Sequence, residues 1–308
     1  MNYKKILKSR NLRIKILKMF SFVPDSAMVR FQYFIKLGRK LNLKNPQRYS
    51  EKIQWYKLNY KEELMAVCSD KADVRNYVKE CGLEEILNEC YGVFNSIDDI
   101  DFEKLPGAFV VKDTLGGGGN SVVLVENKDN EDLGKLRNTM LSWLEKPTNK
   151  KSSGREWVYE NRKHRVMIER LLKNDESGDL HDYKFFCFNG KVYCSYKMEN
   201  YTKNHAAGVM GFFDRDFNLL PVRRADFAPM ENQPQKPENY EKMVEYAEIL
   251  SAPFPHARVD FYNVDRKVVF GELTFFNASG YVQFVPDEFD FEMGKNFLLP
   301  EKRRKRGK

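Results

Sequence analysis

Two acidic residues, Asp260 and Glu272, stand in the segment RVDFYNVDRKVVFGELTFFNASG near the end of the chain. Each lies in a short apolar, β-branched run that predicts a strand, with a turn at Asp265-Arg266 between them. If the strands pair as a hairpin, the carboxylates can meet near one face and offer Mg²⁺ hard oxygen ligands beside phosphate oxygens. The alternative is that each carboxylate faces solvent or an arginine such as Arg258, because strand alternation leaves one face wet.

A run of glycines, Gly116, Gly117, Gly118 and Gly119, follows Lys112 in the segment GAFVVKDTLGGGGNSVVLV. The segment predicts two apolar strands joined by a flexible loop. Glycine amides can approach anionic oxygens without an intervening side chain, so phosphate is the natural ligand. The run is not a Walker loop, since no Lys and Ser or Thr follow, and not a Rossmann fingerprint, since a strand comes next. An ordinary flexible hairpin would show the same run.

A third segment, DYKFFCFNGKVYCSYKM, begins with Asp182 and Lys184 and predicts a hairpin around Asn189-Gly190. The spacing of two residues puts Asp182 and Lys184 side by side on one face of the first strand. A lysine there could stabilise charge on a transferring phosphoryl group or an acyl phosphate. An exposed ion pair is the alternative interpretation.

The elements that position these residues are short predicted strands after residue 107 and mainly helices before residue 100. Helices are predicted over RYSEKIQWYKLN with Ser50 as its cap, over SDKADVRNYVKECG ending at Gly82, and over residues 236–251. The polar, breaker-rich residues 146–154 predict a mobile loop. Antiparallel hairpins with helices on one side indicate the α+β class.

Composition limits the kind of protein. The chain has 308 residues, of which 42% are hydrophobic, so we expect a globular protein. No run approaches the roughly 20 apolar residues of a spanning helix. The five cysteines are odd in number and never occur as CxxC, which argues against a disulfide framework and indicates a reducing cytoplasm.

The net charge of +8 is concentrated at the two ends of the chain. Residues 1–20 interleave apolar and basic residues as a basic amphipathic helix does, and such a helix packs on the protein body or lies on an anionic membrane. The tail KRRKRGK is a solvated charge run. Neither end has the aromatic platform or helix motif of a dedicated nucleic-acid binder, so we expect no nucleic-acid partner.

The order of these segments, with MIERLL between the glycine loop and the Asp182 strand, resembles the ATP-grasp pattern over roughly residues 68–300. More narrowly, the strings SDKADVRNYV, SGREWVYENRKHRVMIERLL, DLHDYKFFCFNGKV, QKPENYEKM, FPHARVDFYNV and FGELTFFNASG look like the teichuronopeptide-biosynthesis, TupA-like type. The resemblance implies two α+β subdomains clasping ATP. It places a helical region at 1–67, the ATP-grasp domain at 68–300 and a basic tail at 301–308.

The resemblance also assigns roles to individual residues. Lys112 matches the lysine on the α- and β-phosphates, Gly116 to Gly119 match the lid over the triphosphate, and Lys184, with Asp182 beside it, matches the basic residue facing the phosphates. Glu169 and Leu171 fall at the hinge, where main-chain atoms meet adenine.

The metal ligands follow from the same resemblance. Asp260 and Glu272 match the magnesium ligands. The third ligand, commonly asparagine two residues after the glutamate, is here Thr274, with Asn277 as a candidate replacement. A second ATP-binding lysine is expected before the hinge, and Lys163 and Arg165 are the candidates.

Family members of this type occur in bacterial cell-surface and capsular polysaccharide biosynthesis and are often labelled glycosyltransferases. Most ATP-grasp enzymes activate a carboxylate as an acyl phosphate that an amine then attacks. We therefore expect ATP and Mg²⁺ as cofactors and a ligase that joins an amino acid or amine to a uronic acid or similar saccharide acceptor. The alternatives are a glycosyl- or phosphoryl-transferase and a non-catalytic nucleotide-binding scaffold. We expect a cytoplasmic location, with peripheral contact to the inner membrane leaflet through the basic N-terminal helix.

Overall fold

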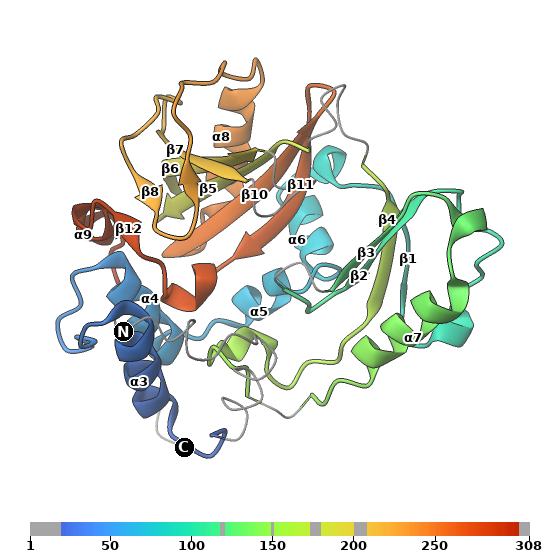
Figure 1. The fold of residues 1–308 in the computed structure, drawn as a ribbon, viewed down its shortest axis with the longest axis horizontal. Coiled ribbons are helices and arrows are strands. Elements are labelled where there is room, and N and C mark those ends of the chain that lie inside the picture. The colour runs from blue at the N-terminus through green and yellow to red at the C-terminus, as the bar shows by residue number, and fades with distance from the viewer. Residues whose placement is uncertain (1–19, 118–120, 149–150, 173–179, 200–207, 302–308) are drawn as a thin grey trace.

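The computed structural model describes residues 20–117, 121–148, 151–172, 180–199 and 208–301. Outside these ranges lie Gly118, Gly119, the predicted basic helix except for Phe20, and the basic tail except for Glu301. The described chain forms two main β-sheets, which stand apart with helices between and around them (Figure 1). This arrangement confirms the α+β prediction.

The smaller sheet has the strand order β1-β4-β2-β3, with all neighbours antiparallel. Its strands are β1 (Cys90–Phe94), β2 (Phe109–Asp113), β3 (Val122–Val125) and β4 (Val166–Arg170). Helix α7 (Leu133–Leu144) covers one face, because Leu136, Met140 and Trp143 recur at helical spacing and bury themselves against the sheet. The Asp132 carboxylate caps α7 by accepting from the Lys135 N–H at 2.9 Å.

The larger sheet has the order β11-β10-β5-β6-β7-β9. Its strands are β5 (Asp182–Phe188), β6 (Lys191–Glu199), β7 (Val209–Asp214), β9 (Ala228–Pro229), β10 (His256–Val264) and β11 (Lys267–Thr274). Helix α8 (Tyr240–Ser251) packs on one face of β5, β6 and β10. Both predicted turns are present: Asn189 and Gly190, and Asp265 and Arg266, have positive φ as tight hairpin turns require.

The two sheets have separate hydrophobic cores. The larger core takes in the big sheet, α8 and the helices between residues 49 and 86, whereas the smaller core is built from β2, β4, α7 and their neighbours. The helix over residues 25–37 has a small cluster of its own. The remaining elements are α3 (Asp25–Leu37), α4 (Tyr49–Asn59), α5 (Glu63–Ser69), α6 (Val74–Glu80), α9 (Glu288–Asn296), β8 (Arg223–Arg224), β12 (Phe284–Val285), η1 (Glu84–Ile86), η2 (Ile97–Asp99), η3 (Lys128–Asn130), η4 (Trp157–Tyr159) and η5 (Asn277–Gly280).

The predicted Ser50 cap is wrong, because α4 begins at Tyr49 and its N-cap is Arg48, two residues before Ser50. The Glu51 carboxylate accepts from the backbone N–H groups of Gln47 and Arg48 at 3.0 and 3.3 Å and so caps the helix. Ser50 lies inside the helix and donates its hydroxyl proton to Asp290 at 2.6 Å. The predicted end of α6 is confirmed, since Gly82 has a φ of 76° just beyond it.

The predicted loop over 146–154 has no helix or strand in its described part. It is nevertheless held to the helices: the Lys57 ammonium donates to the Gly154 carbonyl at 2.7 Å and Lys151 pairs with Asp25 at 2.7 Å. Within the described ranges, every helix is too short or too polar to span a bilayer.

Candidate active site

Asp260 and Glu272 are direct partners across the antiparallel pair β10–β11, so both side chains lie on one face of the larger sheet. A bulge produces this pairing. Phe261 pairs with Phe270, but Asp260 pairs with Glu272, so Gly271 is the extra residue on β11. A Cβ on Gly271 would lie 3.0 Å from the Asp260 carbonyl oxygen, which explains why glycine fits here.

The Arg258 guanidinium lies between these carboxylates. It donates to both Asp260 oxygens at 2.7 Å each and to Glu272 Oε1 at 2.8 Å. The same group donates to Thr274 at 3.1 Å and to the Asn277 side-chain oxygen at 2.6 Å. Because Asp260 is 2% exposed, the arginine supplies charge neutralisation that a buried carboxylate requires.

Lys184 adds a charged side chain on β5, the strand next to β10. It pairs with Asp260 in the β5–β10 register, and its ammonium lies 2.6 Å from both Asp260 and Asp182. The side chain of Lys184 is 12% exposed, so this is a largely buried ion triad rather than the exposed pair of the alternative interpretation. Lys184, Asp260 and Glu272 thus form one row across three adjacent strands.

The smaller sheet carries a second charged cluster. The Lys112 ammonium lies 2.6 Å from Glu169, and Arg75 donates to the other oxygen of that carboxylate at 3.0 Å. Lys112 and Glu169 come from the neighbouring strands β2 and β4. The Glu169 side chain therefore holds the two cations together, a contact separate from the main-chain role expected for this residue. Leu171 directly follows β4 and is partly buried.

Lys71 connects the two clusters. Its ammonium donates to the Gly116 carbonyl at the start of the glycine loop. Burial lowers the pKa of Lys71; the charge of Glu272 on the larger sheet raises it, and that of Lys112 on the smaller sheet lowers it. Lys71 is therefore close enough to both sheets to interact with each, and the clusters face one shared region.

The start of the glycine loop is fixed by the residues around Asp113. This buried carboxylate accepts from the Leu115 N–H at 3.2 Å and lies 2.7 Å from His164 and 2.6 Å from Lys146. A Cβ on Gly116 would collide with Ser121, so the loop needs glycine there, whereas Gly117 has open space.

The donor set on β10 and β11 fits a hard divalent cation. Burial alone would raise the pKa of Glu272, but Arg258, Lys184 and Lys71 outweigh it and lower the pKa to about 2, so the carboxylate is ionised as a metal ligand must be. Beside it, the Asn277 side-chain nitrogen is buried with no hydrogen-bond partner among the described residues; as a donor it suits an anionic oxygen such as that of a phosphate, whereas only the Asn277 oxygen suits a cation. Asp260, Glu272, Thr274 and Asn277 all share Arg258 as a neighbour, so a cation would compete with that guanidinium for the same oxygens. No cluster of three His, Cys, Asp or Glu side chains is found in the described ranges, and the set is therefore two carboxylates with neutral oxygens.

Sequence reasoning missed several cations of the site. The sequence pattern offers Arg258 only as a partner that would make the carboxylates structural, and it gives no indication of a role for Lys71 or Arg75. Of the two candidates for the second lysine, Arg165 points to Asp70 and Asp73, at 2.9 and 2.7 Å. The spacing of Arg258 and Asp260, two residues apart in a strand, is the signal that places both on one face.

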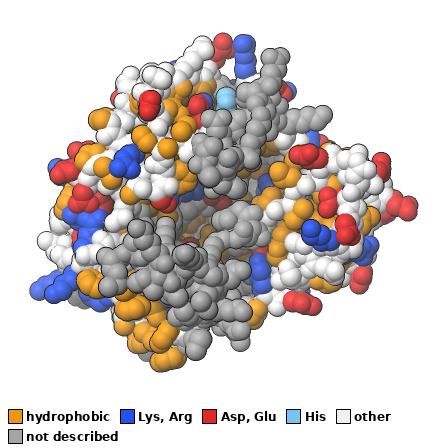
Figure 2. Space-filling view, viewed as in Figure 1, with side chains coloured by type: hydrophobic (Ala, Val, Ile, Leu, Met, Phe, Trp, Pro, Cys, Tyr) orange, Lys and Arg blue, Asp and Glu red, His pale blue; other side chains and the backbone are white. Residues whose placement is uncertain are grey.

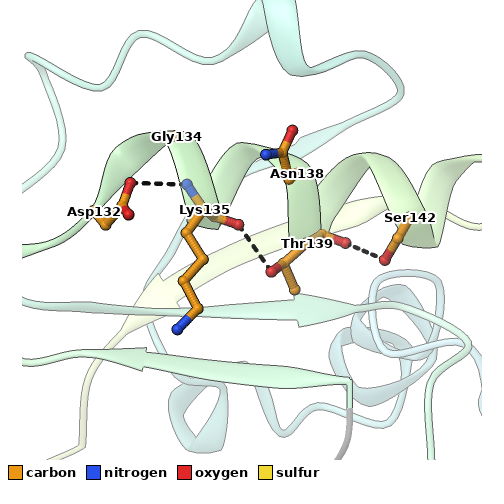
Figure 3. A pocket seen from close by; sticks show the side chains of 6 residues that line it. All are labelled: Asp132, Gly134, Lys135, Asn138, Thr139 and Ser142. Atoms are coloured by element: carbon orange, nitrogen blue, oxygen red, sulfur yellow. Dashed lines mark hydrogen bonds between the residues drawn. The ribbon is translucent and has the colours of Figure 1, made fainter.

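A polar hollow lies on α7, away from the Lys112 and Glu169 cluster of the smaller sheet. It is open and is lined by Asp132, Gly134, Lys135, Asn138, Thr139 and Ser142 (Figure 3). Thr139 and Ser142 donate to backbone carbonyls of their own helix at 2.9 and 2.6 Å. Both hydroxyls therefore have hydrogen-bond partners within the helix. The hollow contains neither the row Lys184, Asp260 and Glu272 nor the cluster around Lys112.

The comparison with protein families agrees with the fold. The family model described as TupA-like ATPgrasp matches residues 51–298. The chain belongs to the TupA-like ATP-grasp family. The matched residues of this TupA-like protein run from α4 to just beyond α9 and include both charged clusters. The search of curated proteins found no match to this chain.

Three named enzymes are among the solved structures to which this chain shows some similarity. The D-alanine–D-alanine ligase of Bacillus anthracis is 20% identical, with 68% of this chain and 57% of that chain covered and a TM-score of 0.43. The D-alanine–D-alanine ligase of Helicobacter pylori is 14% identical, with 82% and 70% covered and a TM-score of 0.43. N5-carboxyaminoimidazole synthetase of Staphylococcus aureus, complexed with ADP, is 13% identical, with 69% and 46% covered and a TM-score of 0.43. The TupA-like chain spans little more than half the length of the Bacillus anthracis ligase.

Proposed function

We propose that the TupA-like protein is an ATP-dependent ligase that requires Mg²⁺ and joins an amine to a carboxylate through an acyl phosphate. The observation that carries the proposal is the row Lys184, Asp260 and Glu272 on one sheet, together with Lys71, which donates to Gly116 at the start of the glycine loop, and Lys112 on the other sheet. Cations from two sheets that converge beside a carboxylate pair suit a nucleoside triphosphate with its metal.

The residues of the site have distinct tasks in this proposal. Lys112, Lys71 and Lys184 neutralise phosphate oxygens, and the amides of the glycine loop approach them. Asp260 and Glu272 would hold the metal, with Thr274 or Asn277 completing its ligands. When bound, Mg²⁺ would offset the negative charge of the phosphates. Arg258 would then be released in part from Glu272 and could stabilise charge that develops on the acyl phosphate.

The proposed reaction has two steps and needs no protein nucleophile. A carboxylate oxygen of one substrate attacks the γ-phosphorus, and ADP leaves. The amine of the second substrate then attacks the acyl carbon, an amide bond forms, inorganic phosphate leaves with the transferred oxygen, and the nitrogen releases one proton to solvent or to the phosphate. Positioning and charge neutralisation carry the catalysis.

The substrates are proposed from the family setting. We infer a uronic acid or similar saccharide as the carboxylate and an amino acid or other amine as the nucleophile, in the synthesis of a bacterial surface or capsular polysaccharide. All five cysteines lie in the described ranges and carry free thiols, which supports a reducing compartment such as the cytoplasm.

The deciding experiment follows the carboxylate oxygen. The protein is incubated with Mg²⁺, ATP, an amine and a uronic acid whose carboxylate carries ¹⁸O, and the released phosphate is analysed by mass spectrometry. One labelled oxygen in the phosphate, together with an amide product, supports the ligase. Glu272→Gln should abolish both signals, whereas the exposed Glu238→Gln should retain them.

Other outcomes identify the alternatives. A phosphate ester or glycoside without label in phosphate would indicate a transferase. If calorimetry detects no Mg-ATP binding by the wild type, the ligase proposal fails and a scaffold is favoured.

A further inference from the structure

Four phenylalanine side chains near the start of the described chain are exposed to solvent. The exposed fractions are 45% for Phe20, 80% for Phe22, 59% for Phe31 and 53% for Phe34. Their combined exposed area is on the order of 400 Å², comparable with the largest apolar patch on a typical soluble monomer. We call these four residues the phenylalanine face.

Helix α3 is apolar on two sides. One side buries Met28, Val29, Tyr33 and Leu37 against the protein. The other presents Phe31 and Phe34, with the exposed Ala27 one turn earlier. The space-filling view shows hydrophobic side chains gathered at the lower edge of the molecule, where α3 lies in the ribbon (Figures 1 and 2). Core packing accounts for the first side only.

The turn before α3 is held by hydrogen bonds to its backbone, whereas the rings of Phe20 and Phe22 are exposed. The buried Arg155 donates to the Phe20 carbonyl at 2.6 Å and to the Ser21 carbonyl at 3.3 Å. It also contacts the Asp25 carboxylate at 3.3 Å. The Phe20 and Phe22 rings lie 6.2 Å apart. The protein thus fixes the backbone of this turn and leaves two aromatic rings in water.

The positive charge of the chain is concentrated in the stretch of sequence that carries the phenylalanine face. Residues 1–44 contain twelve lysines and arginines and a single acidic residue, Asp25, for a net charge of +11. Since the whole chain has a net charge of +8, the remaining residues sum to −3. The aromatic surface and the entire positive excess therefore belong to one stretch of sequence.

We propose that the phenylalanine face docks on an anionic lipid membrane. Phenylalanine rings would enter the boundary between headgroups and acyl chains, and nearby lysines and arginines would contact the acidic headgroups. A net charge of +11 over 44 residues complements such a surface. Contact would be peripheral, and it does not depend on which reaction the TupA-like site performs.

The test is co-sedimentation of the full-length protein with vesicles. Phosphatidylcholine vesicles with and without phosphatidylglycerol are compared, at low and high salt. The wild type should bind only the anionic vesicles, and salt should weaken that binding. Phe22→Ser/Phe31→Ser/Phe34→Ser should reduce binding by roughly tenfold, because binding strength scales with the apolar area buried.

The control removes exposed apolar residues elsewhere. Leu141→Ser/Ile249→Ser changes side chains that are 41% and 37% exposed on α7 and α8, and it should bind vesicles like the wild type. Three results would overturn the proposal: no binding to anionic vesicles, equal binding by the triple variant, or a wild-type dimer that the triple variant dissociates in analytical ultracentrifugation. The last result would assign the face to a protein partner.

Discussion

The ammonium group of Lys112 lies 2.6 Å from the carboxylate of Glu169. The cation proposed to bind phosphate is therefore positioned before any nucleotide arrives, by a residue on the adjacent strand. Arg75 occupies the other oxygen of that carboxylate at 3.0 Å, so Glu169 organises two cations at once. This pre-organisation reduces the conformational cost of binding a triphosphate.

Replacing Lys112 tests this arrangement directly. A charge-assisted hydrogen bond contributes about 1.5–3 kcal/mol, so we expect Lys112→Met to raise the Kd for Mg-ATP at least roughly tenfold. Calorimetry measures the change. Lys191→Met, which removes a 78% exposed lysine paired with Glu248, should leave the Kd unaltered. An unchanged affinity in Lys112→Met would remove this residue from the nucleotide site.

Arg258 should be a major determinant of stability as well as of activity. Arg258→Met leaves the buried Asp260 with Lys184 as its remaining cation, and loss of one partner from a buried ion pair costs about 3–5 kcal/mol. Urea unfolding measures the loss. In the double variant Arg258→Met/Asp260→Asn the uncompensated charge is gone, so its loss should be smaller than the sum of the two single losses by more than about 1 kcal/mol. Additive losses would show that the two side chains do not interact.

The bulge at Gly271 gives a prediction about geometry. In Gly271→Ala the new Cβ would lie 3.0 Å from the Asp260 carbonyl oxygen, so the β10 and β11 backbones must move apart. We expect a loss of about 1–3 kcal/mol in unfolding free energy and a weaker affinity for Mg-ATP. Gly107→Ala is the matched control, because a Cβ there has open space. Equal behaviour of the two variants would contradict the role of the bulge.

The buried Lys57 should contribute stability that rises with pH. Burial lowers the pKa of this lysine from 10.5 to about 7. Between these values the unfolded chain holds a proton that the folded chain has released, so the contribution of Lys57 to the free energy of unfolding should increase as the pH rises above about 7. The five thiols act in the opposite direction, because burial raises their pKa in the fold and they ionise first in the unfolded chain. The measurement is therefore the difference in slope between the wild type and Lys57→Met in urea titrations from about pH 7 to about pH 9, since the thiol effect is the same in both proteins.

The unfolding free energy of Lys57→Met should fall more steeply, or rise less steeply, with pH than that of the wild type, and Lys191→Met should have the slope of the wild type. Equal slopes for the wild type and Lys57→Met would show that Lys57 remains protonated in the fold.

Local patterns were sufficient to predict most elements of the fold. Alternation and turn residues predicted the hairpins at Asn189-Gly190 and Asp265-Arg266, because both depend on neighbours in sequence. The prediction of Ser50 as a helix cap was wrong because it depends on contacts with residues far away in the sequence. Whether a serine or a glutamate caps a helix depends on contacts such as the one between Ser50 and Asp290, which come from distant parts of the chain.

The register of the carboxylate pair could not be obtained by counting. A two-residue turn at Asp265-Arg266 by itself places Asp260 opposite Gly271 and puts Glu272 on the other face. The bulge moves the register by one residue and reunites the carboxylates. Gly271 was a visible cue, but a glycine in a strand does not by itself specify a bulge.

Contacts across elements explain the remaining omissions. Lys71 and Arg75 come from the segment around α6, whereas the groups that attract them lie in the glycine loop, on β4 and on β11. Sequence spacing gives no information about such distant pairs, although the local pattern correctly predicted the strands that carry Asp260 and Glu272.

The separation of charge along the chain has a practical consequence for handling the protein. The intact chain has a pI near 9.0 and should bind a cation exchanger at neutral pH. A product cleaved after residue 44 would carry a net charge of −3 and would elute from that resin or bind an anion exchanger instead. Ion-exchange behaviour is therefore a direct indicator of whether a preparation retains its N-terminal segment.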